Sequence, residues 1–132
     1  MRLLLDTHVF LWLQTEPERL GVQLAVVEDR RTELLVSAAS SWEIAIKHGL
    51  GRLPLPEPPA QYVPARIRAI GASAIPIEHG HVLAVASLPP VHRDPFDRLL
   101  IAQADALGAT ILTADPFVAR YPVQTLLVTG AA

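Results

Sequence analysis

Short apolar runs recur along the chain, and helical segments are predicted between them. Such runs are typical of parallel strands, because both faces of these strands are buried. The predicted strands cover 3–5, 33–37, 74–77, 110–112 and 125–128. The predicted helices cover 8–13, 18–30, 40–48, 64–70, 79–86 and 96–107, with a short helix after Asp115-Pro116. Because Pro76 cannot donate to a ladder, its strand is expected near an edge of the sheet.

The alternation of strands and helices indicates the fold class. It predicts a three-layer α/β/α domain with a mainly parallel sheet of four to five strands. A chain of 132 residues is long enough for one such domain and too short for two ordinary ones. We therefore expect a single domain over residues 1–132 with one functional site.

Capping residues and prolines indicate where the helices begin and end. Ser40 and Glu43 match a capping box, and Asp94-Pro95 places an N-cap before a proline at the first helical position. Gly108 is expected to end the helix that follows. Five of the twelve prolines lie between Pro54 and Pro64, which predicts a stiff connector before the 64–70 helix.

Composition narrows the possible partners and sites. About half of the residues are hydrophobic, so apolar surface is expected to remain for a homodimer or a tight complex with another protein. The net charge of −2 provides no general basic field, so any nucleic-acid phosphates must be bound locally. No cysteine is present, which excludes disulfides and thiolate metal sites. No apolar run is long enough for a membrane span, so a soluble, cytoplasmic protein is expected.

Four acids are expected at one edge of the sheet. Asp6 and Asp115 follow two of the strands, while Glu43 and Asp97 lie in the first turns of two helices. The carboxyl ends of parallel strands form the edge at which such sheets bind ligands. Taken singly, each acid is better explained as a helix cap. Together they would repel one another unless a cation lay between them, which favours a Mg²⁺ or Mn²⁺ site.

Histidines and hydroxyl groups indicate no other hydrolase. The chain contains neither an H-E-x-x-H nor a G-x-S-x-G motif, which argues against a zinc hydrolase and a serine hydrolase. His79 and His81 are expected at the surface or at a helix end. His92 lies beside Asp94 and is placed to approach the acids.

Basic and aromatic residues leave alternatives open. Lys47 lies four residues after Glu43, a spacing that favours an ordinary ion pair within one helix. Trp42 and Phe96 are interpreted as core or interface residues rather than base-stacking platforms. Three arginines lie close in sequence to acids, where they either clamp substrate phosphates or serve as ordinary surface residues: Arg93, Arg98 and Arg120.

Four segments of the sequence contain the acids described above: Leu3-Leu4-Leu5-Asp6-Thr7-His8, Val36-Ser37-Ala38-Ala39-Ser40-Ser41-Trp42-Glu43-Ile44, His92-Arg93-Asp94-Pro95-Phe96-Asp97-Arg98-Leu99-Leu100-Ile101-Ala102-Gln103-Ala104 and Leu112-Thr113-Ala114-Asp115. Together these segments resemble the PIN-domain family, and more closely its VapC-type members. They occur in the family's order and span nearly the whole chain. The segment around Asp97 is the most specific of them.

The resemblance implies a PIN-like fold and a toxin of a bacterial toxin–antitoxin pair. The expected activity is endonucleolytic cleavage of RNA that depends on Mg²⁺ or Mn²⁺, in a dimer that a cognate antitoxin inhibits. The family's acids match Asp6, Glu43, Asp97 and Asp115, which are therefore the expected metal ligands and catalytic residues. Asp94 competes with Asp97 for the third role, and we assign it as the cap. Thr7 and Thr113 are expected to orient carboxylates or waters.

Other functions fit the sequence less well or remain open. A receiver domain needs a lysine after its last strand, but Lys47 is the only lysine in the chain. A haloacid-dehalogenase-like phosphatase needs an aspartate where His8 stands. The main alternative is a catalytically inactive PIN-like module whose acids are only caps. Hydrolysis of DNA is a further alternative, because the 2′-hydroxyl contacts that distinguish RNA cannot be read from the sequence.

Overall fold

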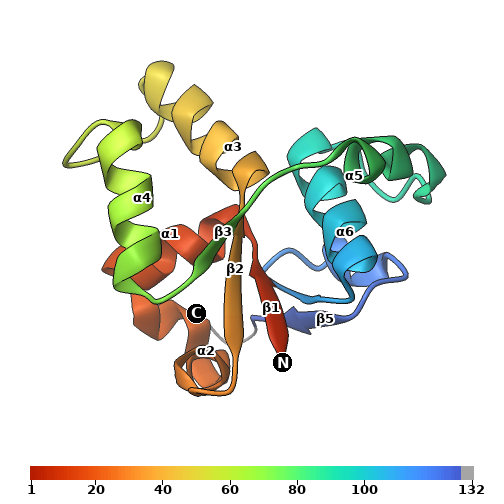
Figure 1. Ribbon diagram of the computed structural model, residues 1–132, viewed down its shortest axis with the longest axis horizontal. Helices are drawn as coiled ribbons and strands as arrows, with labels where there is room; N and C mark the ends of the chain where they lie inside the picture. The colour runs from red at the N-terminus through yellow and green to blue at the C-terminus, as the bar shows by residue number, and fades with distance from the viewer. Residues whose placement is uncertain (129–132) are drawn as a thin grey trace.

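Five parallel strands form one sheet in the computed structural model, which describes residues 1–128 (Figure 1). The strands are β1 (Arg2–Leu5), β2 (Glu33–Ser37), β3 (Ser73–Ile75), β4 (Thr110–Thr113) and β5 (Thr125–Leu127). Their order is β3-β2-β1-β4-β5, and every neighbouring pair is parallel. The predicted parallel sheet is confirmed, and so is the edge position of the third strand. The predicted bounds of that strand, 74–77, are wrong, because it ends at Ile75 and does not contain Pro76. Of the expected domain, residues 129–132 lie outside the described part of the chain.

Helices cover both faces of this sheet. They are α1 (Thr7–Thr15), η1 (Pro17–Gln23), α2 (Leu24–Glu28), α3 (Ala38–Gly49), α4 (Pro59–Ala69), α5 (His79–Ala84), η2 (Val85–Ser87), α6 (Pro95–Leu107) and η3 (Val118–Arg120), where η marks a 3₁₀ helix. Successive residues of a strand point to opposite faces. Leu3 and Leu5 therefore pack with α1 and α4, while Leu4 packs with α6. This arrangement confirms the three-layer fold.

Three predicted helix limits are wrong. The 18–30 helix is broken at Gly21, whose φ of 56° and ψ of −132° suit glycine and not a helix. The 64–70 helix begins earlier, at Pro59, since proline is well tolerated at a first helical position. Pro64 lies inside this helix and removes one backbone hydrogen bond from it. The helix expected from Ser40 begins at Ala38, with Ser37 as its N-cap.

No helix within residues 1–128 is both long enough and apolar enough to cross a membrane.

Gly108 ends α6 in the left-handed conformation, with a φ of 63°. Because no atom lies within 4 Å of the position of an added Cβ, the cost of a side chain there is purely conformational. We expect Gly108→Ala to lower the free energy of unfolding by about 1 kcal/mol, measured by urea denaturation. Gly49→Ala is the matched control: it is equally open, lies in α3 and should be neutral or stabilising. Equal effects of the two substitutions would contradict this explanation.

Candidate metal-dependent active site

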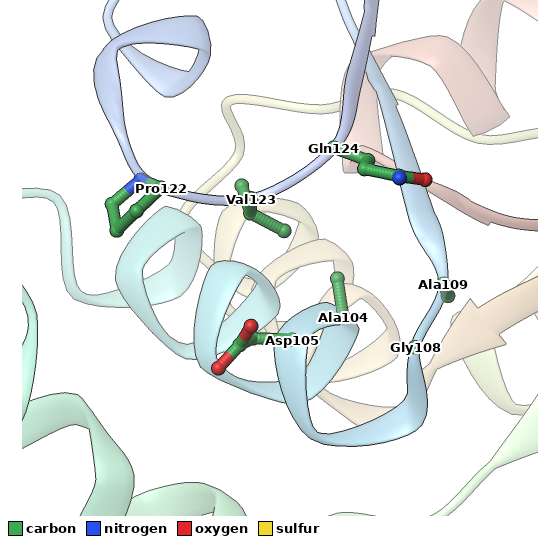
Figure 2. A pocket seen from close by; sticks show the side chains of 7 residues that line it. All are labelled: Ala104, Asp105, Gly108, Ala109, Pro122, Val123 and Gln124. Carbon is green, nitrogen blue, oxygen red and sulfur yellow. The ribbon is translucent and has the colours of Figure 1, made fainter.

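Two of the hollows formed by the described residues lie at opposite ends of the sheet. The first, of about 420 Å³, lies between the last turn of α6 and the segment leading into β5 (Figure 2). Its polar side chains are Asp105 and Gln124, and the Gln124 amide oxygen already accepts a hydrogen bond from Thr110. The second, of about 280 Å³, lies at the carboxyl ends of the strands and is lined by all four predicted acids. Of these two hollows, this second cleft is the one that gathers several ionisable side chains.

Each oxygen of the Asp6 carboxylate accepts a hydrogen bond. It follows β1 directly and caps α1, so that its Oδ1 accepts a hydrogen bond from the backbone N–H of His8 at 3.3 Å. Its Oδ2 accepts a hydrogen bond of 2.6 Å from the hydroxyl of Thr113, at the end of β4. Burial raises the pKa of Asp6, whereas these two hydrogen bonds act in the opposite direction. The carboxylate is thus fixed in orientation at the floor of the cleft.

Glu43 does not cap a helix. Ser37 caps α3 by accepting the N–H of Ala39 at 3.0 Å, which places Glu43 in the second turn. The predicted capping box is therefore wrong, because the hydroxyl of Ser40 instead accepts a buried hydrogen bond from Thr7 at 2.9 Å. Glu43 is only 5% exposed, and its Oε2 lies 2.7 Å from Nζ of Lys47, which confirms the predicted ion pair.

Asp94 and Asp97 divide two roles between them. Asp94 is the N-cap of α6 and accepts hydrogen bonds from the N–H groups of Phe96 and Asp97 at 2.9 and 3.2 Å. Asp97 makes no cap, and its side chain faces the cleft. Its pKa is raised to about 8, first by burial and then by Asp6, Asp94, Asp115 and Glu43. Asp94 is thus the cap, and Asp97 is the acid that belongs to the cluster.

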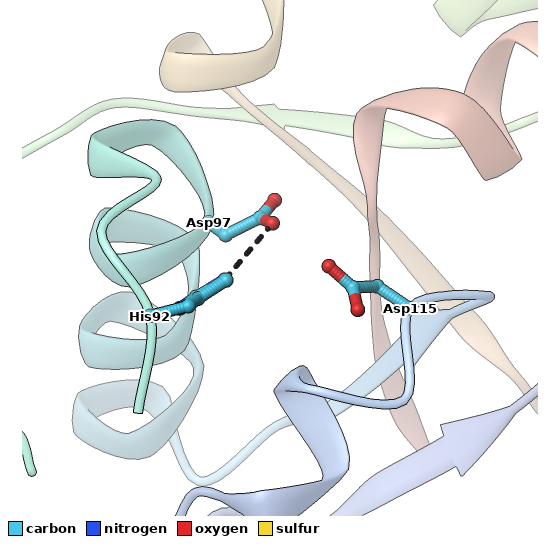
Figure 3. A group of neighbouring side chains, drawn as sticks. All are labelled: His92, Asp97 and Asp115. Carbon is cyan, nitrogen blue, oxygen red and sulfur yellow. Dashed lines mark hydrogen bonds and ion pairs between the residues drawn. The ribbon is translucent and has the colours of Figure 1, made fainter. Parts of the chain in front are cut away.

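Asp115 closes the cluster from the loop after β4. Its Oδ1 accepts the N–H of Phe117 at 2.9 Å, and its own N–H donates to Oγ1 of Thr113 at 3.0 Å. Thr113 therefore joins Asp6 and Asp115 through one hydroxyl group. Figure 3 shows Asp97, Asp115 and His92 converging, and one possible ligand atom of each lies within 4.8 Å of the others. His92 approaches the acids as expected.

The charges in this cleft are unbalanced. Among the described residues that line it, five are carboxylates and Lys47 is the one permanent cation. Lys47 already pairs with Glu43. Burial and, after it, the neighbouring carboxylates raise the pKa of Asp97, and the part due to the carboxylates reflects the excess of negative charge. Hard divalent cations prefer carboxylate oxygens, so the donor set fits Mg²⁺ or Mn²⁺.

The contacts of three neighbouring residues exclude some of the roles expected for them. The guanidinium of Arg98 donates to the carbonyls of Pro89 and Val85 and to the hydroxyl of Tyr121, so it anchors a loop rather than clamping a phosphate. The hydroxyl of Thr7 donates to Ser40 and not to a carboxylate, so that half of the expectation is wrong, and a role in orienting water stays a prediction. Trp42 is 59% exposed and packs edge-on against Phe96 at the surface, so it lies outside the core, and its predicted place in an interface stays a prediction.

Other expectations hold or stay open. His81 lies in the first turn of α5, where its Nδ1 accepts the N–H of Glu78, and His79 is exposed at the start of the same helix. These positions confirm the surface or helix-end assignment. Arg93 and Arg120 are exposed, and their role stays a prediction.

Two cleft residues were missed in the sequence, His8 and Trp12. They lie four residues apart on α1 and therefore share one face of the helix that Asp6 caps. This spacing was a signal that could have identified them. The guanidinium of Arg19 also packs over the ring of Trp12 in a cation–π contact, with its Cζ 4.0 Å from the ring centre.

Comparisons with known proteins agree with this geometry. The PIN domain family matches residues 3–123. The chain is 32% identical over 115 residues to ribonuclease VapC22 of Mycobacterium tuberculosis, which covers 85% of each protein. It is 54% identical over 57 residues to ribonuclease VapC16 of the same organism, a match that spans 43% of this chain and only 40% of that relative.

A solved structure has the same fold. The crystal structure of VapBC2 from Rickettsia felis, bound to a promoter DNA fragment, contains a chain that superposes with a TM-score of 0.74. The match covers 96% of this chain and 98% of that chain at 15% identity, and it shows the fold alone. From the family match and the identity to VapC22 along most of both sequences, this chain belongs to the PIN-domain family and is of the VapC type.

Proposed function

We propose that this protein is a metal-dependent endoribonuclease that acts as the toxin of a toxin–antitoxin pair. The observation that carries the proposal is the convergence of Asp6, Glu43, Asp97 and Asp115 in one cleft with excess negative charge. Ribonuclease activity rather than hydrolysis of DNA is supported by the two relatives, both of which are named ribonucleases.

Asp6 and Asp97 would hold the principal ion, and Glu43 and Asp115 would complete the site directly or through water. A bound Mg²⁺ or Mn²⁺ supplies activation of water and stabilisation of the leaving oxygen in phosphodiester hydrolysis. The protein's contribution is to fix the carboxylates. Thr113 orients Asp6, and Lys47 holds one oxygen of Glu43. No side chain is needed as a covalent nucleophile.

Two protein partners belong to the proposal, a second copy of this chain and a cognate antitoxin. The antitoxin is supported by the fold's likeness to a chain of the VapBC2 assembly. Exposed apolar side chains also support a protein that is covered in its assemblies, because Trp42, Val82 and Leu83 are 59%, 50% and 70% exposed.

RNA cleavage should depend on Asp6 and on metal. We expect purified protein to cut a labelled RNA pool with Mg²⁺ or Mn²⁺ and to be inert with a chelator. Asp6→Asn should slow cleavage by about 100-fold or more, since a misplaced ion loses several kcal/mol of transition-state stabilisation.

Asp105→Asn is the control for that experiment, because Asp105 is an exposed acid of α6 outside the cleft. If folded wild type cuts no RNA and binds no metal by calorimetry, the alternative of an inactive binding module replaces the proposal. Equal cleavage of DNA of the same sequence would argue against a ribonuclease.

The hydroxyl of Thr113 should matter for metal affinity, because it fixes both Asp6 and the backbone of Asp115. We expect Thr113→Val to weaken Mn²⁺ binding by about 10- to 100-fold in calorimetry, which is typical for loss of a group that orients a ligand. Thr110→Val is the matched control on the same strand, since Thr110 bonds Gln124 at the other end of β4. Equal losses in both variants would show a general effect on the strand.

The metal-free protein should lose stability as the pH rises. Asp97 has its pKa raised from 3.8 to about 8 in the folded state, so the folded protein binds more protons than the unfolded chain across that range. Stability is therefore highest below about pH 4 for this group and falls as the pH approaches 8. We expect Asp97→Asn to raise the melting temperature in EDTA at pH 8 by several degrees, where about 1 kcal/mol corresponds to roughly 4 °C.

The same comparison at pH 5 should show a much smaller difference between the two proteins, because Asp97 is then largely protonated. Mn²⁺ should stabilise wild type at pH 8 more than the variant. A variant that melts below wild type at pH 8 in EDTA would contradict the charge crowding at this site.

A further inference from the structure

His92 links the acid cluster to the loop before α6. Its side chain is only 14% exposed, and its ring lies between two polar groups. Nε2 lies 3.3 Å from Oδ2 of Asp97, as the dashed line in Figure 3 marks. On the other side, Nδ1 lies 2.7 Å from the hydroxyl of Tyr121. The ring also stacks on Phe117 at a centroid distance of 6.1 Å.

The hydrogen bonds of Tyr121 determine which ring nitrogen of His92 carries a hydrogen. The phenol oxygen accepts from Nη1 of Arg98 at 3.0 Å and from the backbone N–H of His92 at 3.2 Å. These two donors occupy both lone pairs of the oxygen. The hydroxyl hydrogen must then be donated, and the nearer acceptor is Nδ1 at 2.7 Å rather than the carbonyl of His92 at 3.4 Å.

Because Nδ1 accepts, the neutral ring carries its hydrogen on Nε2 and donates it to Asp97. Arginine has donors only, so Arg98 sets the donor-to-acceptor direction of this series of hydrogen bonds. The hydrogen bonds run from Arg98 to Tyr121, from Tyr121 to His92 and from His92 to Asp97. A nitrogen that carries this hydrogen offers no lone pair to a cation, although it lies close to Asp97 and Asp115.

We propose that His92 is a positioning residue: it orients Asp97 for cation binding through the Arg98–Tyr121–His92 chain and does not itself bind the ion. In the ionised form that binds a cation, Asp97 is repelled by the acids around it, and the hydrogen bond from Nε2 of His92 holds its Oδ2 in place. The guanidinium of Arg98 is anchored in turn by the carbonyls of Pro89 and Val85. The inference deepens the proposed function by adding residues that support its metal site.

Mn²⁺ binding to the full chain without RNA tests the inference. We expect His92→Ala to weaken Mn²⁺ affinity by about 10- to 100-fold in calorimetry. Tyr121→Phe should weaken it in the same direction, although the Tyr121 hydroxyl bonds His92 and Arg98 rather than a carboxylate, and the buried ring keeps its packing. The double variant should be no weaker than His92→Ala, because both residues act through one chain of bonds. His92→Gln should restore part of the affinity, since its amide can still donate.

Two controls separate positioning from other effects. His79→Ala removes an exposed imidazole of α5 and should leave the affinity unchanged. The paramagnetic resonance of bound Mn²⁺ should show no coupling to the imidazole nitrogen of His92. Because His8 also lines the cleft, the spectrum is compared with that of His92→Ala at saturating Mn²⁺. A coupling that this variant loses, or unchanged affinity in both Tyr121→Phe and His92→Ala, would overturn the inference.

Failure of this inference is distinguishable from failure of the proposed function. If the variants lose Mn²⁺ affinity as expected while wild type cuts no RNA, the positioning role stands and the ribonuclease proposal fails. If wild type cuts RNA but the variants bind Mn²⁺ normally, the reverse holds. Absence of Mn²⁺ binding in folded wild type would overturn the positioning role.

Discussion

Repulsion between carboxylates is the constraint on which the cleft depends. Asp6 and Glu43 are each 5% exposed, and Asp97 lies among them with its pKa raised to about 8. Water screens such charges poorly in a partly buried cleft, so the surrounding protein must hold them in place. Each acid is accordingly tied to a donor: Asp6 to Thr113, Glu43 to Lys47, Asp97 to His92 and Asp115 to the N–H of Phe117.

The parallel sheet brings these donors and acids together. Asp6 follows the central strand β1, and Asp115 follows its neighbour β4, so their positions depend on strand pairing. Glu43 and Asp97 come from helices that begin at the same edge. The side chains that the central strand buries in the hydrophobic clusters on the two faces of the sheet are all apolar, namely Leu3, Leu4 and Leu5. Apolar packing of the strands thus supports the cluster of acids at their carboxyl ends.

Much of this arrangement could be predicted from the sequence. The strands were recognisable because parallel strands buried on both faces are continuous apolar runs, and the convergence of the acids follows from sheet topology. Helix limits were less predictable. Ser37, Ser40 and Ser41 are all possible caps, and the contact that decides between them is the bond of Ser40 to Thr7, 33 residues away in the sequence.

Long-range contacts also explain why part of the site was not predicted. The role of Arg98 depends on Tyr121, which lies 23 residues further along the chain, and no local pattern connects the two. The helix break at Gly21 was missed because apolar residues continue at helical spacing on both sides of it. Interactions within one turn of a helix, such as Asp94 with Phe96 and Asp97, were predictable from neighbouring residues.

The hydrogen bond from Thr113 to Asp6 joins the ends of the central strand β1 and its neighbour β4 at the floor of the cleft. Leu5 of β1 pairs with Leu112 of β4, and the next residue along each strand, Asp6 or Thr113, is one partner of this hydrogen bond. A slip of β4 by a single residue would turn Thr113 towards the opposite face of the sheet. Misaligned forms of the sheet would therefore lack an ordered acid site, so correct strand alignment during folding and competence for chemistry arise in the same step.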